Sequence, residues 1–334
     1  MAKVISKKIK IGIVVVASAL IGGGSLLYQK FFGGKIQNIP QGKFVIGEPQ
    51  RQPEQVREEK KQEKVAVAYA ETPALGIQEV VARTGDFDFI KPGQKVLVKP
   101  NVNSDDPSPG TTHHEALAEV VRLAKAKGAY VIVGDRSNPM FGTISAMKKT
   151  GMYEAAKKAG ADEILGFEDG EWMRVKPEGA KNWTAGFRVP KLLSEVDHVI
   201  SLPVLHTHSM TGYSLALKNL VGLIHPADRM IFHASSKTQE MIAEISLAVK
   251  PSITIIDGTK AFISGGPMKG TAANTKVYLA SKDVLMAEVF GVELLRKHGA
   301  DLDSPWESDQ VKRALELGLG FEREEIEEEL KKKS

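Results

Sequence analysis

Short runs rich in valine and isoleucine recur along this chain, and segments with helical spacing separate them. Two of the clearest runs are Lys95–Asn101 (KVLVKPN) and Tyr130–Gly134 (YVIVG). Between them, His113–Lys127 carries apolar residues at helical intervals, with Thr112 placed to cap the helix and Gly128 to follow it. Runs this apolar are typical of strands that are buried on both faces. The alternation predicts an α/β fold with a largely parallel sheet and helices on both faces.

Residue type and spacing also predict the remaining elements. Trp172–Val175 and Phe187–Val189 are expected to pair as a hairpin, because a Gly- and Pro-rich turn separates them. Thr143–Ala159 is expected to be helical with a break near Gly151. Further strands are expected at Lys64–Ala70, Glu163–Phe167, His198–His206, Ser252–Asp257 and Thr275–Ala280, and further helices at Ile77–Ala82, Thr238–Val249, Val284–His298, Gln310–Leu317 and Glu322–Lys333.

Residues 11–28 carry no charged side chain and follow a lysine-rich start. As a helix, this run would be about 27 Å long, close to the roughly 30 Å of a bilayer core. We therefore predict one N-terminal transmembrane helix within residues 1–30, in contact with a membrane through residues 11–28. Positive charge stays on the cytoplasmic side, so we expect a single-pass protein of the cell membrane with its globular part on the extracytoplasmic side. A cleaved signal peptide is the alternative.

A change of composition marks the start of the globular part. Glu48–Lys64 contains almost no apolar residue and cannot bury a core. We therefore expect a membrane anchor at 1–30, a flexible charged linker at 31–64, an α/β domain at 65–320 and a charged tail at 321–334.

Composition excludes several classes of function. The 334 residues contain no cysteine, which rules out disulfides, thiolate nucleophiles, cysteine-ligated zinc and cysteine-ligated iron–sulfur clusters. The net charge is only +4, and much of the surplus lies in the first ten residues, so no nucleic-acid surface is expected. Composition leaves the oligomeric state open.

Polar residues follow several of the expected strands at the point where each strand ends. In open α/β sheets, ligands bind beyond the carboxyl ends of the strands. If the strands are parallel, these residues line one edge of the sheet, and we expect a pocket there. The strand-end residues are Lys99, Asn101, Asp135, His206, His208 and Asp257, and Lys218 lies in an apolar run shortly after the two histidines.

Six short motifs occur in a recognisable order: Lys99-Pro100-Asn101, Thr112-His113-His114-Glu115, His206-Thr207-His208, Lys218-Asn219-x-x-Gly222, Asp257-Gly258 and Gly265-Gly266-Pro267. In this order and spacing, over roughly Lys95 to Gly291, they resemble the domain of unknown function 362 family. The resemblance implies a fold and a pocket and leaves the reaction open. Many members carry a ferredoxin-like iron–sulfur module, which a chain without cysteine cannot hold.

The sequence departs from the family pattern in three places. His114 replaces a usual proline, His206 stands where lysine is usual, and Glu288 stands near the position of a usual aspartate. If the missing lysine is essential in relatives, the activity here is changed or lost.

One hypothesis for the chemistry is a divalent metal site. His206 and His208 lie two residues apart on one strand, so both imidazoles face the same side and can chelate one ion. Asp135 or Asp257 would complete the ligand set, His113 is a further candidate ligand, and a bound water would become the nucleophile. The alternative is that both imidazoles only form hydrogen bonds within a polar cleft.

A second hypothesis is a pocket for a small anionic molecule. Lys99, Lys218 and the start of the helix after Thr112 all favour negative charge. His208 or His113 would then serve as general acid or base near neutral pH. In this interpretation Asn101, Asn219 and the loop Gly265-Gly266-Pro267 bind or orient the ligand, and Asp135 or Asp257 orients a histidine.

These hypotheses combine into one expectation and two alternatives. We expect a membrane-anchored extracytoplasmic protein with a polar strand-end pocket for an anionic small molecule, which uses histidine acid–base chemistry if it is an enzyme. The alternatives are a metal-dependent enzyme with His and Asp ligands, and a protein that binds a ligand or partner without turnover.

Overall fold

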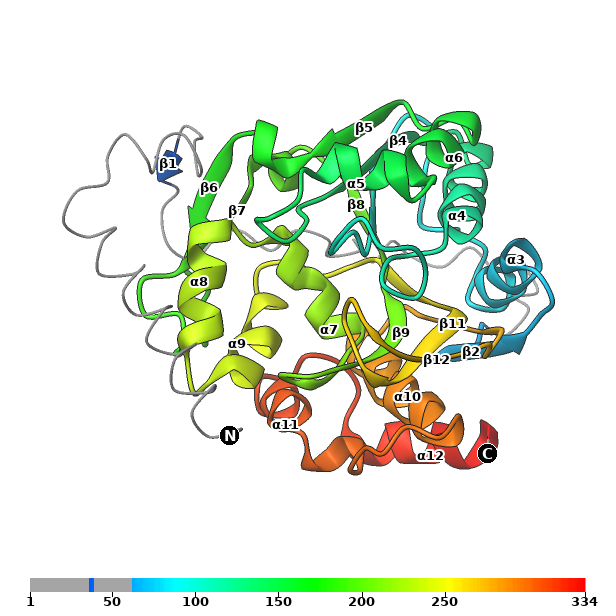
Figure 1. Cartoon of the computed structure of the whole chain (residues 1–334), viewed down its shortest axis with the longest axis vertical. Helices are drawn as coiled ribbons and strands as arrows, with labels where there is room; N and C mark the ends of the chain where they lie inside the picture. Colours follow the sequence, from blue (N-terminus) through cyan, green and yellow to red (C-terminus); the bar gives the residue numbers. More distant parts are fainter. Residues whose placement is uncertain (1–35, 39–61, 334) are drawn as a thin grey trace, which may run out of the picture. The chain divides into compact units, whose positions relative to one another are not determined.

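The computed structural model describes residues 36–38 and 62–333. Most strands form one ten-stranded sheet, with helices on both sides of it (Figure 1). The strands are β2 (Val65–Tyr69), β3 (Lys95–Pro100), β4 (Tyr130–Asp135), β5 (Glu163–Gly166), β8 (His198–Leu202), β9 (Val204–His208), β10 (Gly212–Ser214), β11 (Ile253–Gly265), β12 (Gly270–Ala273) and β13 (Val277–Ser281).

The central part of the sheet is parallel, as the apolar runs predict. The order is β10-β9-β11-β8-β3-β4-β5, and the neighbours from β11 to β5 run parallel. Val96 and Val98 of β3 pack into one hydrophobic cluster, while Leu97 between them packs into the other. Successive side chains of a strand point to opposite faces, so a continuous apolar run is what a sheet covered on both faces requires.

The prediction of a largely parallel sheet is only partly right, because the sheet is mixed. β10 runs antiparallel to β9, β12 and β13 run antiparallel to β11, and β13 also pairs antiparallel with β2. β11 is much longer than the predicted Ser252–Asp257, and short turns connect it to β12 and β12 to β13. A connection as short as the one between β11 and β12 can join only antiparallel strands. β12 and β13 run in the same direction and pair with successive parts of β11.

Helices cover the two faces of the sheet with different hydrophobic clusters. Helices α3 (Pro73–Arg83), α4 (His114–Ala126), α5 (Thr143–Lys149) and α6 (Met152–Lys158) supply one cluster. The break between α5 and α6 falls at Gly151, whose φ of 80° is the left-handed conformation that glycine adopts readily. The other cluster lies among α7 (Ala216–Asn219), α8 (Pro226–Ala234), α9 (Thr238–Ile245), α10 (Val284–Lys297), α11 (Asp309–Glu316) and α12 (Arg323–Lys333).

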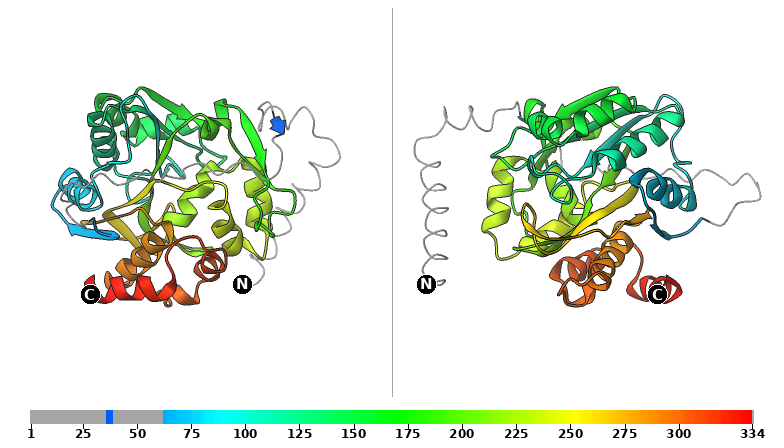
Figure 2. Two further views of the ribbon diagram at one scale, coloured as in Figure 1. Left: turned by 180° about the vertical axis from the view of Figure 1, so that it is seen from behind. Right: turned by 45° about the vertical axis from the view of Figure 1, so that its right-hand side comes forward.

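The remaining elements are short. β6 (Trp172–Val175) and β7 (Phe187–Pro190) pair antiparallel, which confirms the predicted hairpin, and β1 (Ile36–Asn38) pairs with β6. Figure 2 shows from two further sides how α4 and α6 lie beside β4 and β5, while α10, α11 and α12 lie beyond β11. Turns of 3₁₀ helix occupy Phe167–Asp169, Lys191–Ser194, Leu220–Leu223 and Pro305–Glu307.

The predicted anchor at 11–28 and nearly all of the linker lie outside the described residues. Within residues 36–38 and 62–333, no helix combines the length and apolarity needed to cross a membrane. The charged run near the C-terminus forms α12, which buries Ile326 and is joined to the start of the domain by an ion pair between Lys64 and Glu325 at 3.1 Å. The predicted tail helix therefore packs on the domain.

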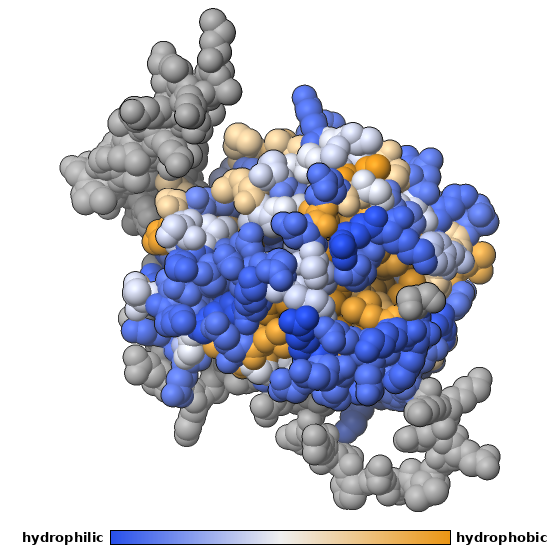
Figure 3. All heavy atoms as spheres, turned by 90° about the horizontal axis from the view of Figure 1, so that it is seen from below, coloured by the Kyte–Doolittle hydropathy of each residue, from blue (hydrophilic) through white to orange (hydrophobic). Residues whose placement is uncertain are grey.

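A cavity of about 710 Å³ lies between β2, α10 and α12. Figure 3, which views the side carrying these helices, shows apolar side chains exposed between charged ones. The lining includes Val67, Phe290, Leu294 and Leu330 and none of the polar residues predicted at the strand ends.

Candidate functional site

The carboxyl ends of β3 and β4 are joined by a buried ion pair. Lys99 Nζ lies 2.8 Å from Asp135 Oδ1, and the two side chains are 1% and 3% exposed. The ammonium also donates to Pro100 O at 3.0 Å and to Asn219 Oδ1 at 3.2 Å. A lysine ammonium has three donors, and Lys99 Nζ is surrounded by three acceptor oxygens, two through hydrogen bonds and one through the ion pair. Burial lowers the pKa of Lys99, and Asp135 opposes that shift.

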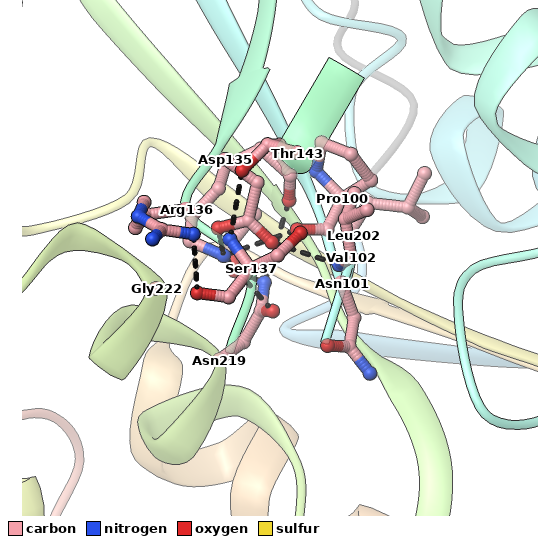
Figure 4. Close-up of polar contacts among 12 residues, drawn as sticks. Pro100, Asn101, Val102, Asp135, Arg136, Ser137, Thr143, Leu202, Asn219 and Gly222 are labelled. Atoms are coloured by element: carbon pink, nitrogen blue, oxygen red, sulfur yellow. Dashed lines mark hydrogen bonds and ion pairs between the residues drawn. The ribbon is translucent and has the colours of Figure 1, made fainter. Parts of the chain in front are cut away.

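Asn219 ties helix α7 to two strands of the sheet. Its Nδ2 donates to Ser201 Oγ at 2.9 Å and to Lys99 O at 3.3 Å, so the side chain is used fully inside the protein. Figure 4 shows it pointing from α7 toward the polar cluster that contains Asp135, whereas the side chain of Asn101 turns away from that cluster. These contacts favour a structural role for Lys99 and Asn219, which the sequence suggested as ligand contacts.

Gly222 completes the Lys-Asn-x-x-Gly motif for a steric reason. A Cβ atom at this position would lie 2.2 Å from Asp135 Oδ1 and 2.5 Å from Lys99 Nζ. Real Cβ atoms do not approach heavy atoms this closely, so only glycine fits against the ion pair. The motif spacing thus places the amide of Asn219 beside Lys99 and a residue without a side chain, Gly222, beside both Lys99 and Asp135.

Arg229 on α8 holds the neighbouring loops, and sequence reasoning missed it. Its guanidinium donates to four backbone carbonyls, those of Ile224 at 2.8 Å, Ser137 at 3.1 Å, Arg136 at 2.7 Å and Gly222 at 2.9 Å. Burial lowers the pKa of Arg229 to about 10. An arginine within a short amphipathic helix gives no local sign of this role, because two of its four acceptors, the carbonyls of Arg136 and Ser137, come from the loop after β4, 93 and 92 residues away.

The two histidines at the end of β9 are buried and neutral. His206 Nδ1 lies 2.8 Å from Thr207 O and therefore carries the proton, which leaves Nε2 to accept from Asn101 Nδ2 at 3.4 Å. His208 Nδ1 accepts from Met210 N at 3.1 Å, so its proton lies on Nε2. Burial lowers the pKa of His206 to about 4 and that of His208 to about 2. Neither imidazole is charged at pH 7.

Lys218 differs from Lys99 in having no partner. It is 9% exposed, and within residues 62–333 its ammonium forms no hydrogen bond and no ion pair. Burial lowers the pKa of Lys218 to about 7, and the charge of Glu288 opposes this. The charge of Lys218 in turn lowers the pKa of His206 and His208, which places the three side chains in one electrostatic neighbourhood.

Glu288 on α10 is a buried carboxyl group whose charge raises the pKa of Lys218. Its Oε2 accepts from Leu217 N at 2.9 Å, and Gln310 donates to Oε1. Burial raises the pKa of Glu288 to about 7, and the hydrogen bond from Leu217 N opposes this. Glu288 thus fixes the backbone of Leu217, the residue before Lys218, and forms no ion pair with Lys218 within residues 62–333.

Asp257 and Thr112 take other positions than the sequence predicts. β11 continues past Asp257 to Gly265, so this aspartate is not at a strand end. It accepts from His113 N at 2.7 Å and from Thr259 N at 3.0 Å. Thr112 does not cap α4, because its hydroxyl donates to Leu202 O at 2.9 Å, and the N-cap is His113. Burial lowers the pKa of His113, which is half-buried.

The loop at Gly265 and Gly266 is the turn between β11 and β12. Gly266 N donates to Lys269 O at 2.7 Å, which closes the turn on itself. A Cβ on Gly266 would lie 2.2 Å from Thr207 O, so glycine lets the turn approach the end of β9. The backbone of the turn is therefore engaged within the protein, as in a plain hairpin turn.

The predicted site residues sort into three adjoining groups. They adjoin because Lys99 pairs in register with Ser201 and Asp257 with Val204, on the strands that lead into His206. Within residues 62–333, no three His, Asp or Glu side chains gather closely enough to hold a metal ion. Asp135 and Asp257, the expected third ligands, are bound elsewhere. The groups are Lys99 with Asp135 and Asn219, Asp257 with His113 and Thr259, and Lys218 with His206, His208 and, through His206, Asn101.

Comparison with known proteins gives the family. Thylakoid-associated protein sll1697 of Synechocystis sp. (strain ATCC 27184 / PCC 6803 / Kazusa) is 28% identical over 220 residues, which are 64% of this chain and 66% of that protein. The alignment therefore spans just under two thirds of the relative. No solved structure matches the chain. The family model described as "Domain of unknown function (DUF362)" matches residues 96–293, more than half of the chain. The protein therefore belongs to the DUF362 family.

Proposed function

We propose that this protein binds a small anionic molecule at the Lys218 site, defined as Lys218, His206 and His208. The observation that carries the proposal is the buried ammonium of Lys218 without a hydrogen bond or ion pair among residues 62–333. A buried charge without a partner is costly. A bound anion would supply that partner, and the proton on His208 Nε2 would be a second donor to it.

The same site suits proton transfer, with Lys218 in the central role. A general acid or base works best when its pKa lies near the operating pH. The pKa of Lys218, about 7, meets this condition, whereas that of His208, about 2, makes its imidazole a very weak base. We therefore assign acid–base chemistry to Lys218 and keep His208 as a neutral hydrogen-bond donor.

Thermal unfolding in the presence of oxalate tests the binding proposal. Oxalate keeps its charge between pH 6 and 9, so any pH dependence reports on the protein. We expect oxalate to raise the melting temperature at pH 6.5 relative to chloride at equal ionic strength, because a ligand that binds only the folded state stabilises it. The effect should shrink above pH 7 as Lys218 loses its proton.

Two variants separate the site from a general salt effect. Lys218→Met should lose the response to oxalate, and Lys250→Met, which removes an exposed lysine, should keep it. An equal response in wild type and Lys218→Met would show that oxalate does not act at Lys218. An enzyme and a binding protein without turnover are then distinguished by whether a ligand that binds at the site is consumed over time.

We also propose that residues 11–28 anchor the protein in a membrane with the globular domain on the extracytoplasmic side. The support is the uncharged run after a lysine-rich start and a relative named a thylakoid-associated protein. We expect the full-length chain to fractionate with membranes after a high-salt or carbonate wash, and a chain beginning at residue 62 to stay in the supernatant. Mature protein that starts past Tyr28 would instead indicate a removed signal peptide.

A further inference from the structure

We propose that Lys218 is a nucleophile that forms an imine with the carbonyl carbon of a small 2-oxo acid bound at the Lys218 site. This inference rests on the proposed function, because the acid group of the ligand is the anion expected there. It adds the chemical class of the ligand and the bond that is made.

The surroundings of the two buried lysines point to Lys218 and away from Lys99. Lys99 is 1% exposed, and all of its donors are occupied. Lys218 is 9% exposed, and its Nζ is not among the fully enclosed side-chain atoms that lack a partner. The amine of Lys218 is therefore sheltered but reachable, and it has no hydrogen bond to another residue of the range 62–333 to break before it reacts.

An imine requires a neutral amine, and the site supplies one. With a pKa of about 7 for Lys218, roughly half of the amine is neutral at pH 7, against about 0.03% for a lysine with the usual pKa. Desolvation next to neutral groups is a known way to activate a lysine. His206 and His208 are neutral, and no ion pair holds the amine in its charged form.

The step balances without any further reactant. The amine nitrogen adds to the carbonyl carbon, a carbon–nitrogen double bond forms, and the carbonyl oxygen leaves as water with the two hydrogens of the neutral amine. The Nε2 proton of His208 would be the donor to the ligand's oxygen atoms. The neutral imine then takes up one proton from water, and the charge of Glu288, whose pKa is about 7, favours the protonated imine electrostatically.

Reductive trapping tests the inference with glyoxylate as the probe. Full-length protein is incubated with glyoxylate and sodium cyanoborohydride at pH 7.5, and the peptides are mapped by mass spectrometry. We expect one carboxymethyl group on Lys218, at a rate roughly tenfold or more above that of an exposed lysine such as Lys250, because far more of the buried amine is neutral. Oxalate, which has no reactive carbonyl, should protect Lys218.

The controls separate this inference from the proposed function. Lys218→Met should lose the fast modification while still unfolding cooperatively, and Lys250→Met should keep it. If oxalate raises the melting temperature but glyoxylate does not label Lys218, the imine is excluded and anion binding stands. If neither occurs, both proposals fail. The imine is also excluded if the exposed lysines are all labelled at similar rates and Lys218 is among the slowest to react.

Discussion

Replacing Lys99 with methionine is expected to lower the free energy of unfolding by about 3–5 kcal/mol. The carboxylate of Asp135 would remain buried, and Val102 N would be its one remaining hydrogen-bond donor among residues 62–333. Asn219 would also lose the donor to its Oδ1. Breaking one side of a buried ion pair costs more than the pair contributes, because the remaining charge loses its direct partner. Besides the hydrogen bond from Val102 N, Asp135 keeps the electrostatic attraction of Arg229. Urea unfolding followed by circular dichroism measures the change.

The double variant Lys99→Met/Asp135→Asn is the matched control. It removes both charges and retains an oxygen that can accept from Val102 N. Its free energy of unfolding should lie above that of Lys99→Met alone, since no unpaired charge remains. A double variant that is less stable than Lys99→Met would mean that Asp135 has another partner in the folded protein and that the ion pair is not what joins β3 to β4.

Replacing Lys218 with methionine is expected to have the opposite sign and to stabilise the protein by about 1–4 kcal/mol at pH 6.5. The cost of burying an unpaired ammonium is present when the lysine is protonated in both states, which holds below its folded pKa of about 7. Between pH 7 and the unfolded value of 10.5, the folded protein binds fewer protons than the unfolded chain. The wild type therefore gains stability as pH rises through this interval.

The difference between Lys218→Met and wild type should thus be largest near pH 6.5 and nearly vanish by pH 10.5. Urea unfolding at pH 6.5, 8 and 9.5 gives the three points, and Lys250→Met should match wild type at each. Glu288 titrates near 7 and lies in the same neighbourhood, so Glu288→Gln measured in both backgrounds isolates its share. A destabilisation by Lys218→Met that is equal at all three pH values would refute the unpaired buried charge.

Lys99→Met and Lys218→Met compare two buried lysines that have similar surroundings in the sequence. Both lie in or beside apolar runs, and both are followed within one or two residues by an asparagine. One is saturated by acceptors and joins strands. The other has no hydrogen-bond or ion-pair partner in the described part of the chain and interacts electrostatically with two neutral histidines. The opposite signs expected for their stability effects follow from that difference alone.

Local patterns in the sequence were enough to predict the parallel centre of the sheet, the β6–β7 hairpin and the break at Gly151. These features depend on side-chain alternation and on glycine backbone freedom, which act over a few residues. The polar ends of β3 and β4 could also be expected to meet, because parallel neighbours end on the same edge of a sheet.

Only the tertiary structure decided which of these polar residues is available. Lys99 donates to Asn219, 120 residues away, and Asp257 accepts from the backbone N–H of His113, 144 residues away. The continuation of β11 past Asp257 depends on pairing with β9 and β12. Hydrogen-bond saturation is a property of groups brought together from distant parts of the chain, so local spacing names the candidates but cannot show which donor is left free. That Lys218 is a buried lysine without a hydrogen-bond or ion-pair partner among residues 62–333 can be seen only when the fold is known.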